Sequence, residues 1–141
     1  MNARHTPHRL VRHGTAALLA LTLLASLAQA ADTTPAAQLE RFSQLAGRPG
    51  DATRGQAFFT ARHGGEWSCS SCHGAPPTTA GRHASTGKRI EPLAPAANPG
   101  ALTDTAKVDK WFRRNCKDVA QRECTADEKA DVLAYLIKVT P

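Results

Sequence analysis

The segment SCSSCHG, residues 68–74, holds two cysteines three positions apart and a histidine directly after the second one. Cys69, Cys72 and His73 thus form the pattern C-x-x-C-H, which is the attachment motif of c-type haem. Two thiols at this spacing can add across the two vinyl groups of one porphyrin, and the adjacent imidazole can then reach the iron. The motif predicts one covalent haem c, bound through Cys69 and Cys72, with His73 as the proximal iron ligand.

Two other chemistries use closely spaced cysteines, and neither suits the surrounding sequence. A thioredoxin-like redox pair belongs to a βαβ unit, and no strand pattern precedes Cys69. A zinc site would need a second pair at similar spacing, whereas Cys116 and Cys124 lie too far apart in the sequence. The haem interpretation also explains residues 63–100, which are rich in Gly, Pro, Ser and Thr and are predicted to form a long loop around the porphyrin.

The first 30 residues have the features of a secretory signal peptide. Three arginines precede an uncharged run over residues 15–27, which is followed by the small-residue sequence Ala-Gln-Ala. The run is shorter than the roughly 20 residues that a membrane-spanning helix needs, so a membrane anchor would result only if cleavage failed. We expect cleavage after residue 30 and export of residues 31–141 to the periplasm, as one domain without a membrane span.

This domain is small and weakly basic. The three arginines of the leader account for half of the chain's net charge of +6, which leaves +3 for residues 31–141. No basic run or basic-aromatic pattern points to nucleic acid, so the positive surface suits an acidic protein partner or simple solvation. A domain of this size buries little apolar area unaided, and a bound haem would add to its core.

The hydrophobic pattern predicts an all-α domain of about four helices with long connections, and it contains no strand alternation. The first helix spans about residues 34–47 and begins with the cap Thr34. The second spans about residues 51–62, with three residues facing inward: Ala57, Phe58 and Ala61. The fourth begins with a capping box of Thr125 and Glu128, and its apolar stripe consists of Val132, Leu133, Leu136, Ile137 and Val139.

The third helix, KVDKWFRRNC at residues 107–116, carries an unusual stripe. Val108, Trp111 and Phe112 fall at the i, i+3 and i+4 positions of one helical face, and Thr103 is the expected cap. The next position on that face is Asn115, so an amide continues an otherwise apolar stripe.

The sixth iron ligand cannot be the methionine that c-type electron carriers normally use, because the only methionine is Met1, in the leader. The remaining candidates are His63, His83, Lys88, Asn115 or an empty site. If the stripe of the third helix packs on the haem, the Asn115 amide points toward the iron. Its carbonyl oxygen is a hard donor that suits ferric iron better than ferrous iron, so reduction would weaken the bond and open the site.

Two further pairings are expected around the site. Cys116 and Cys124 should form a disulfide, because the compartment is oxidising and neither cysteine belongs to the haem motif. The second ring nitrogen of His73 needs a hydrogen-bond acceptor to fix the orientation of the ring. We expect that acceptor to be a backbone carbonyl near Pro92 or Pro95.

Beyond the motif, the chain resembles class I cytochromes c. RGQAFF at residues 54–59 is similar to their Gly-x-x-x-aromatic first core helix, and EKADVLAYL is similar to their last helix. TGKRIEPLAP at residues 86–95 and VDKWFRRNC…C…EKADVLAYL at residues 108–136 resemble more closely the sphaeroides haem protein family of small periplasmic cytochromes c. One departure is the loop at residues 60–68, which is shorter than expected and carries His63.

The resemblance implies that Asn115, next to the disulfide cysteine Cys116, binds ferric haem iron and leaves on reduction. Small diatomics such as oxygen and nitric oxide then bind, and the redox partners are a dihaem cytochrome c and a membrane cytochrome b. The leading hypothesis is a periplasmic monohaem cytochrome that transfers electrons and, when reduced, binds oxygen, nitric oxide or carbon monoxide. The alternatives are a plain bis-histidine carrier and a haem enzyme that converts the gas, although no distal acid or proton relay is visible in the sequence.

Overall fold

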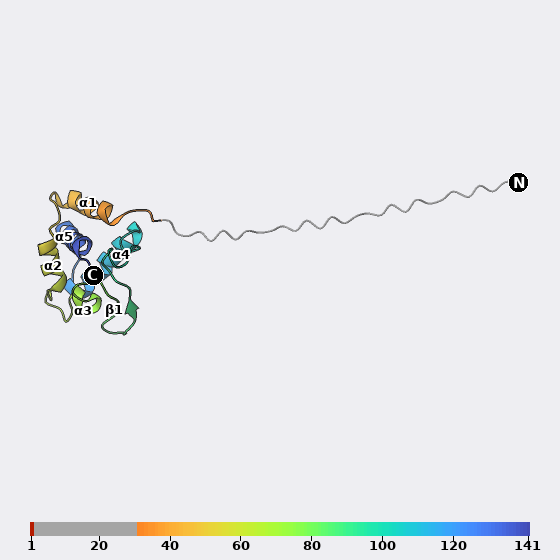
Figure 1. The fold of residues 1–141 in the computed structure, drawn as a ribbon. Coiled ribbons are helices and arrows are strands. Elements are labelled where there is room, and N and C mark those ends of the chain that lie inside the picture. Colours follow the sequence, from red (N-terminus) through yellow and green to blue (C-terminus); the bar gives the residue numbers. More distant parts are fainter. Residues whose placement is uncertain (2–30) are drawn as a thin grey trace.

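The computed structural model describes residue 1 and residues 31–141, so the predicted signal peptide lies, except for Met1, outside the described residues (Figure 1). The elements follow in the order α1 (Pro35–Ala46), α2 (Ala52–Thr60), α3 (Cys69–His73), β1 (Gly81–Arg82), β2 (Arg89–Ile90), α4 (Thr105–Ala120) and α5 (Ala126–Lys138). The prediction of an all-α domain with long loops is confirmed. Within the described residues, no helix is long and apolar enough to cross a membrane.

The region between α2 and α4 is not loop alone, contrary to the sequence prediction. It contains the short helix α3 and a minimal antiparallel hairpin, in which Gly81 of β1 pairs with Ile90 of β2. The helix has 5 residues and each strand has 2, which is too short to produce a recognisable hydrophobic period.

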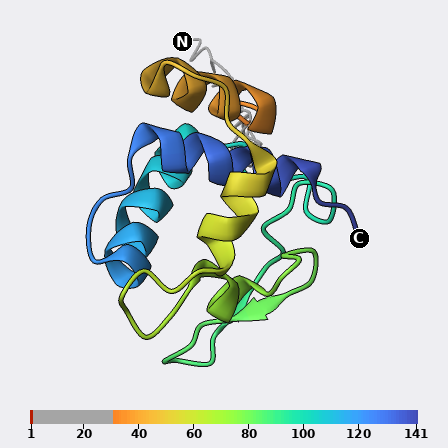
Figure 2. The ribbon, with the colours of Figure 1, turned by 90° about the vertical axis from the view of Figure 1, so that its left-hand side faces the viewer.

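Helix α5 forms the centre of the core and packs against both α1 and α2 (Figure 2). Its buried residues recur at the spacing of one helical face, and they include Ala130, Val132, Leu133, Tyr135 and Leu136. Ile137 and Val139, which were expected on the same stripe, are half-buried. The predicted capping box is present, because Thr125 and Glu128 each accept a hydrogen bond from the backbone N–H of the other.

Helix α2 buries a different face from the one predicted. Phe59 is 1% exposed and Gly55 is buried, whereas Ala57 and Ala61 are exposed and Phe58 is half-buried. The reason is the close crossing of α2 over α5, since a Cβ atom at Gly55 would collide with the backbone carbonyl of α5. Only glycine permits this approach, so the buried stripe follows the Gly-x-x-x-aromatic spacing.

A buried carboxylate on α5 ties the same crossing together. Asp131 accepts hydrogen bonds from Arg54 Nε and Nη2, both at 2.8 Å, and from the backbone N–H of Asp51 at 2.7 Å. Burial alone would raise the pKa of Asp131, but the hydrogen bonds from Arg54 and Asp51 outweigh it and hold the pKa below its ordinary value. The carboxylate is therefore fully partnered.

The ends of the other two long helices are also set by polar side chains. Thr34 caps α1 by accepting a hydrogen bond from the backbone of Ala37 at 3.1 Å, as predicted. The cap of α4 is Asp104 and not Thr103, since the Asp104 carboxylate accepts from the backbone N–H of Lys107 at 2.8 Å. An ionised carboxylate at this position also interacts favourably with the positive end of the helix dipole. Helix α4 continues for four residues beyond the predicted end.

Candidate haem-binding site

Helix α3 presents the two motif cysteines and the histidine within a single turn. Ser68 and Ser71 form a capping box that fixes the start of the helix. Cys69 and Cys72 are half-buried free thiols that are not bonded to one another. Their i, i+3 spacing puts both sulfur atoms on the same side of the helix, where they can reach one planar group.

His73 has an unsatisfied polar atom. Its Nδ1 is buried and has no hydrogen-bond partner among the described residues. The prediction of an acceptor near Pro92 or Pro95 is therefore wrong in this structure. The Pro92 carbonyl is already engaged, because it accepts from the Asn98 amide at 2.9 Å. Burial also lowers the pKa of His73, which favours the neutral imidazole whose lone pair a metal can use.

Cys69 and Cys72 differ in their surroundings. Burial raises the pKa of Cys69 to about 11, so its sulfur stays protonated near neutral pH. The sulfur of Cys72 accepts a hydrogen bond from the backbone N–H of Ala84, which follows β1, at 3.3 Å. This contact ties the hairpin to the second thiol of the motif. Two free thiols and an imidazole that is neutral near physiological pH lie on one helical turn, and they are the donor set that a covalent haem needs, so these residues fit that cofactor.

Helix α4 carries the predicted stripe and, with it, the candidate ligand Asn115. Val108 is buried, and Phe112 packs against the core from a half-buried position. Trp111, predicted to share that buried face, is instead 48% exposed, because it lies at the edge of the stripe. Asn115 is half-buried, one turn beyond Trp111, and within the described chain no hydrogen bond reaches its side chain. The amide is therefore available for a ligand.

The predicted competitors of Asn115 are occupied or exposed. The Nε2 atom of His63 lies 2.9 Å from the backbone carbonyl of Phe58, and the two rings are 4.1 Å apart between centroids. His83 is exposed, and its Nδ1 lies 3.1 Å from the hydroxyl of Ser85. Lys88 is exposed next to β2.

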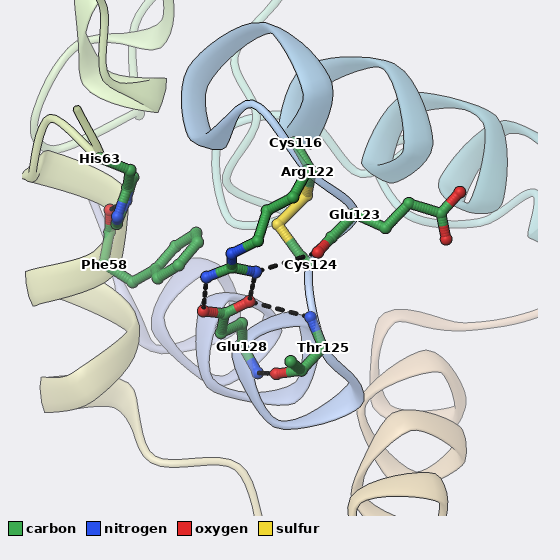
Figure 3. Close-up of a disulfide and its surroundings, with 8 residues drawn as sticks. All are labelled: Phe58, His63, Cys116, Arg122, Glu123, Cys124, Thr125 and Glu128. Carbon is green, nitrogen blue, oxygen red and sulfur yellow. Dashed lines mark hydrogen bonds and ion pairs between the residues drawn. A yellow bond between two sulfur atoms is a disulfide. The ribbon is translucent and has the colours of Figure 1, made fainter. Parts of the chain in front are cut away.

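The disulfide partners lie at the junction of α4 and α5 (Figure 3). The sulfur atoms of Cys116 and Cys124 are 1.98 Å apart, and both residues are buried. Below the bridge, Arg122 forms a two-pronged ion pair with Glu128 at 2.6 and 2.7 Å. The hydrogen bonds from Arg122 hold the pKa of Glu128 below its usual range, so the pair stays charged near neutral pH.

The structure thus gathers the predicted site residues into two groups. Cys69, Cys72 and His73 share α3, while Asn115 and the disulfide belong to the C-terminal half of α4 and its connection to α5. Helices α3 and α4 do not pack closely on one another. Phe59 was missing from the predicted inward residues, yet its ring centroid lies 6.3 Å from that of His73. The signal that could have found it was its spacing of four residues from Gly55.

A C-x-x-C-H turn followed by long loops, with a first core helix crossing a closing C-terminal helix, defines the class I type of c-type cytochrome. Residues 45–136 match a family model described as a domain of unknown function (DUF1924). The chain is 48% identical over 123 residues to the cytochrome c-type protein SHP of Cereibacter sphaeroides, which covers 84% of this chain and 95% of that protein. The chain therefore belongs to the SHP family of cytochromes c, the sphaeroides haem protein family.

Other similarities agree with this assignment. Cytochrome c'' of Methylophilus methylotrophus is 39% identical over 92 residues, which are 62% of this chain and 64% of that protein. A solved structure of oxidised SHP, described as an oxygen-binding cytochrome c, matches with a TM-score of 0.70 and 49% identity, over 74% of this chain and 96% of the other. The crystal structure of oxidised cytochrome c'' matches with a TM-score of 0.67 and 32% identity, over 76% and 95% respectively.

Proposed function

We propose that this chain is a periplasmic monohaem cytochrome c that transfers electrons and binds a diatomic gas when reduced. The observation that carries the proposal is the combination of a complete haem-attachment turn on α3 with a free amide, and no available methionine, on the expected distal side. The description of SHP as oxygen-binding supports oxygen as one ligand, and carbon monoxide and nitric oxide are diatomics of similar size that also bind ferrous haem iron.

The residues of α3 would hold the cofactor. Cys69 and Cys72 would form the two thioether bonds, and His73 would bind the iron from the proximal side. When bound, the haem would supply reversible one-electron chemistry and an iron atom to which a small ligand could bind. His73 is half-buried, and this burial lowers its pKa, which favours the neutral imidazole that binds iron.

Asn115 would be the distal ligand in the ferric state only. Its side-chain oxygen is neutral and hard, so it loses affinity when the iron loses positive charge. The half-buried position at the edge of the α4 stripe gives the amide room to turn outward without disturbing Val108 or Phe112. The disulfide fixes the neighbouring Cys116, so the side chain can move while the helix backbone stays in place.

The ferrous absorption spectrum of the holoprotein, recorded with and without carbon monoxide, tests this proposal. We expect a five-coordinate ferrous spectrum that shifts on adding the gas. Asn115→Ala should change the ferric spectrum while leaving haem attachment and carbon monoxide binding intact. Asn115→Met should hold the ferrous iron through a softer sulfur, which would raise the reduction potential and slow gas binding.

The matched controls are His63→Ala and His83→Ala. Both should leave the ferric spectrum unchanged, because these rings lie against Phe58 and in an exposed turn. If either histidine variant changes that spectrum while Asn115→Ala does not, the chain is a bis-histidine carrier. Steady turnover of nitric oxide or oxygen with an electron donor would instead identify a gas-converting enzyme.

Two parts of the proposal concern the setting of the protein. We propose that residues 1–30 are a signal peptide and that residues 31–141 form the exported domain, with one haem per chain. Mass spectrometry of periplasmic protein should give the mass of residues 31–141 plus a single haem, and a mass equal to the bare chain would refute attachment. A dihaem cytochrome c and a membrane cytochrome b are proposed as redox partners from the family resemblance.

A further inference from the structure

The outward face of α4 concentrates cations that have no carboxylate partner. Four such side chains lie between residues 110 and 117, and none of them forms an ion pair within the described chain: Lys110, Arg113, Arg114 and Lys117. The neighbouring carboxylate Asp118 is also unpaired there, so it offsets only part of the charge. By contrast, five arginines elsewhere are paired with carboxylates: Arg41, Arg48, Arg54, Arg89 and Arg122.

A large aromatic side chain lies beside these cations. Trp111 is 48% exposed, and among residues 31–141 only Leu45 is a comparably exposed large hydrophobic residue. The Lys110 ammonium is 5.4 Å and the Arg114 guanidinium 5.3 Å from the centroid of the indole ring. Both distances are within the range of cation–π attraction, so two charges are held close to the exposed ring.

We infer that this face of α4 is the docking surface for an acidic electron-transfer protein, an inference that rests on the electron-transfer function proposed above. Unpaired cations on one face accelerate encounter with a partner of opposite charge. Tryptophan and arginine are the residues that most often dominate binding at the centre of an interface. Asn115 lies one turn from Trp111 on the same helix, so a partner bound here would sit close to the redox centre.

The composition of the face favours a protein over a membrane as its occupant. The cations cover a little over two turns of one helix, and among residues 31–141 no second exposed large apolar side chain lies beside the indole. Membrane-surface helices instead carry a broad apolar face of several large residues below their cations. A protein can match a few charges around one central ring, which is the arrangement of a small interface.

Stopped-flow reduction of the ferric holoprotein by reduced flavodoxin, a small acidic electron-transfer protein, tests the inference. The variant Lys110→Glu with Arg114→Glu should lower the second-order rate constant about tenfold at low ionic strength and reduce its salt dependence. The control Arg62→Glu with Lys138→Glu changes the net charge equally at two exposed positions outside α4, and it should lower the rate less than about twofold. Equal losses in both variants, or no loss in the α4 variant, would overturn the docking surface.

Reduction by a neutral flavin separates this inference from the function on which it rests. All variants should accept electrons from the neutral flavin at the wild-type rate, because no charged encounter is involved. A wild-type holoprotein that this reagent cannot reduce would contradict the electron-transfer function itself. Binding of the wild type, but not the α4 variant, to vesicles of anionic phospholipid, without a charge effect on flavodoxin kinetics, would assign the face to membranes and overturn the inference.

The role of the ring has its own test. Trp111→Ala should lower the rate with flavodoxin several-fold while leaving the ferric spectrum and the salt dependence unchanged, because the four cations remain. A changed ferric spectrum would show that the indole packs on the cofactor and would remove it from the docking surface.

Discussion

Helices α5 and α4 have 13 and 16 residues, and they are held in different ways. Helix α5 packs along two other helices, and its buried carboxylate accepts hydrogen bonds from Arg54, Arg48 and the backbone of Asp51. Among the helices of residues 31–141, α4 packs closely along none of the others, and it touches the core mainly through Val108 and Phe112. Trp111 is left half-exposed. The comparison shows that the contacts of the α2–α5 crossing are made by protein atoms alone. On α4, by contrast, several side chains have no protein partner within the described chain and are available to bind other molecules.

The largest effect on stability should come from placing a larger residue where α2 and α5 cross. Gly55→Ala would put a methyl group into the backbone carbonyl of Asp131, and backbone cannot move aside as a side chain can. We expect a loss of about 3 kcal/mol or more in the free energy of unfolding, measured by urea denaturation of the holoprotein. The exposed neighbour Gln56→Ala is the control, with an expected change within about 0.5 kcal/mol. Equal stability of the two variants would contradict the proposed close packing.

Removing the disulfide should weaken the link between α4 and the segment that leads to α5, and it should leave the α2–α5 crossing unchanged. The pair Cys116→Ser and Cys124→Ser opens a loop whose ends are 8 positions apart. The chain-entropy model gives a loss of about 2.5 kcal/mol in the free energy of unfolding. Because Cys116 adjoins Asn115, we also expect a broader or altered ferric spectrum. Thiol titration provides the check on the wild type, since two reactive thiols in the native, unreduced holoprotein would disprove the bridge.

A smaller, pH-dependent effect is expected from Asp131→Asn. Its folded-state pKa lies below the ordinary value of 3.8, so its stabilisation is fully present above that value and is lost as the pH falls through the folded-state pKa. The variant should lose about 2 kcal/mol at neutral pH and should show a flatter decline in stability on acidification. Asp109→Asn, which removes the exposed partner of Arg41, should cost no more than about 1 kcal/mol. If Asp131→Asn lost stability on acidification as steeply as the wild type, Asp131 would not be the source of the pH dependence.

Much of this fold could be predicted because its signals are local. The cap Thr34, the capping box of Thr125 and Glu128, and the C-x-x-C-H turn each depend on residues within a few positions of one another. The inward face of α2 was predicted one residue out of place, because Gly55 is buried by a backbone contact that carries no hydrophobic signal. The hairpin of two-residue strands is likewise held by a contact with Cys72 that periodicity does not encode.

The site divides in the same way. The spacing of Cys69, Cys72 and His73 identifies them as one motif, so the sequence was sufficient to name that half of the site, although it did not predict the short helix α3 that carries them. The acceptor for His73 depends on how a loop distant in sequence places its carbonyls, and the Asn98 amide donates to that of Pro92, one of the two expected acceptors. The exposure of Trp111 depends on how α4 is rotated against the core, and the stripe of apolar residues alone does not determine that rotation to within one residue.

The two free thiols of α3 impose an order on the assembly of the molecule. Four cysteines can be joined in pairs in three ways, and only one of these leaves Cys69 and Cys72 without sulfur partners from α4 and its loop. In an oxidising compartment, thiols that stay unreacted can form disulfides with non-native partners. The high pKa of Cys69 slows the formation of such disulfides in the folded chain, because little of the attacking thiolate is present. Thioether formation ends the competition altogether, so we expect cofactor attachment to precede or accompany oxidation, and a chain starved of haem to accumulate mispaired isomers.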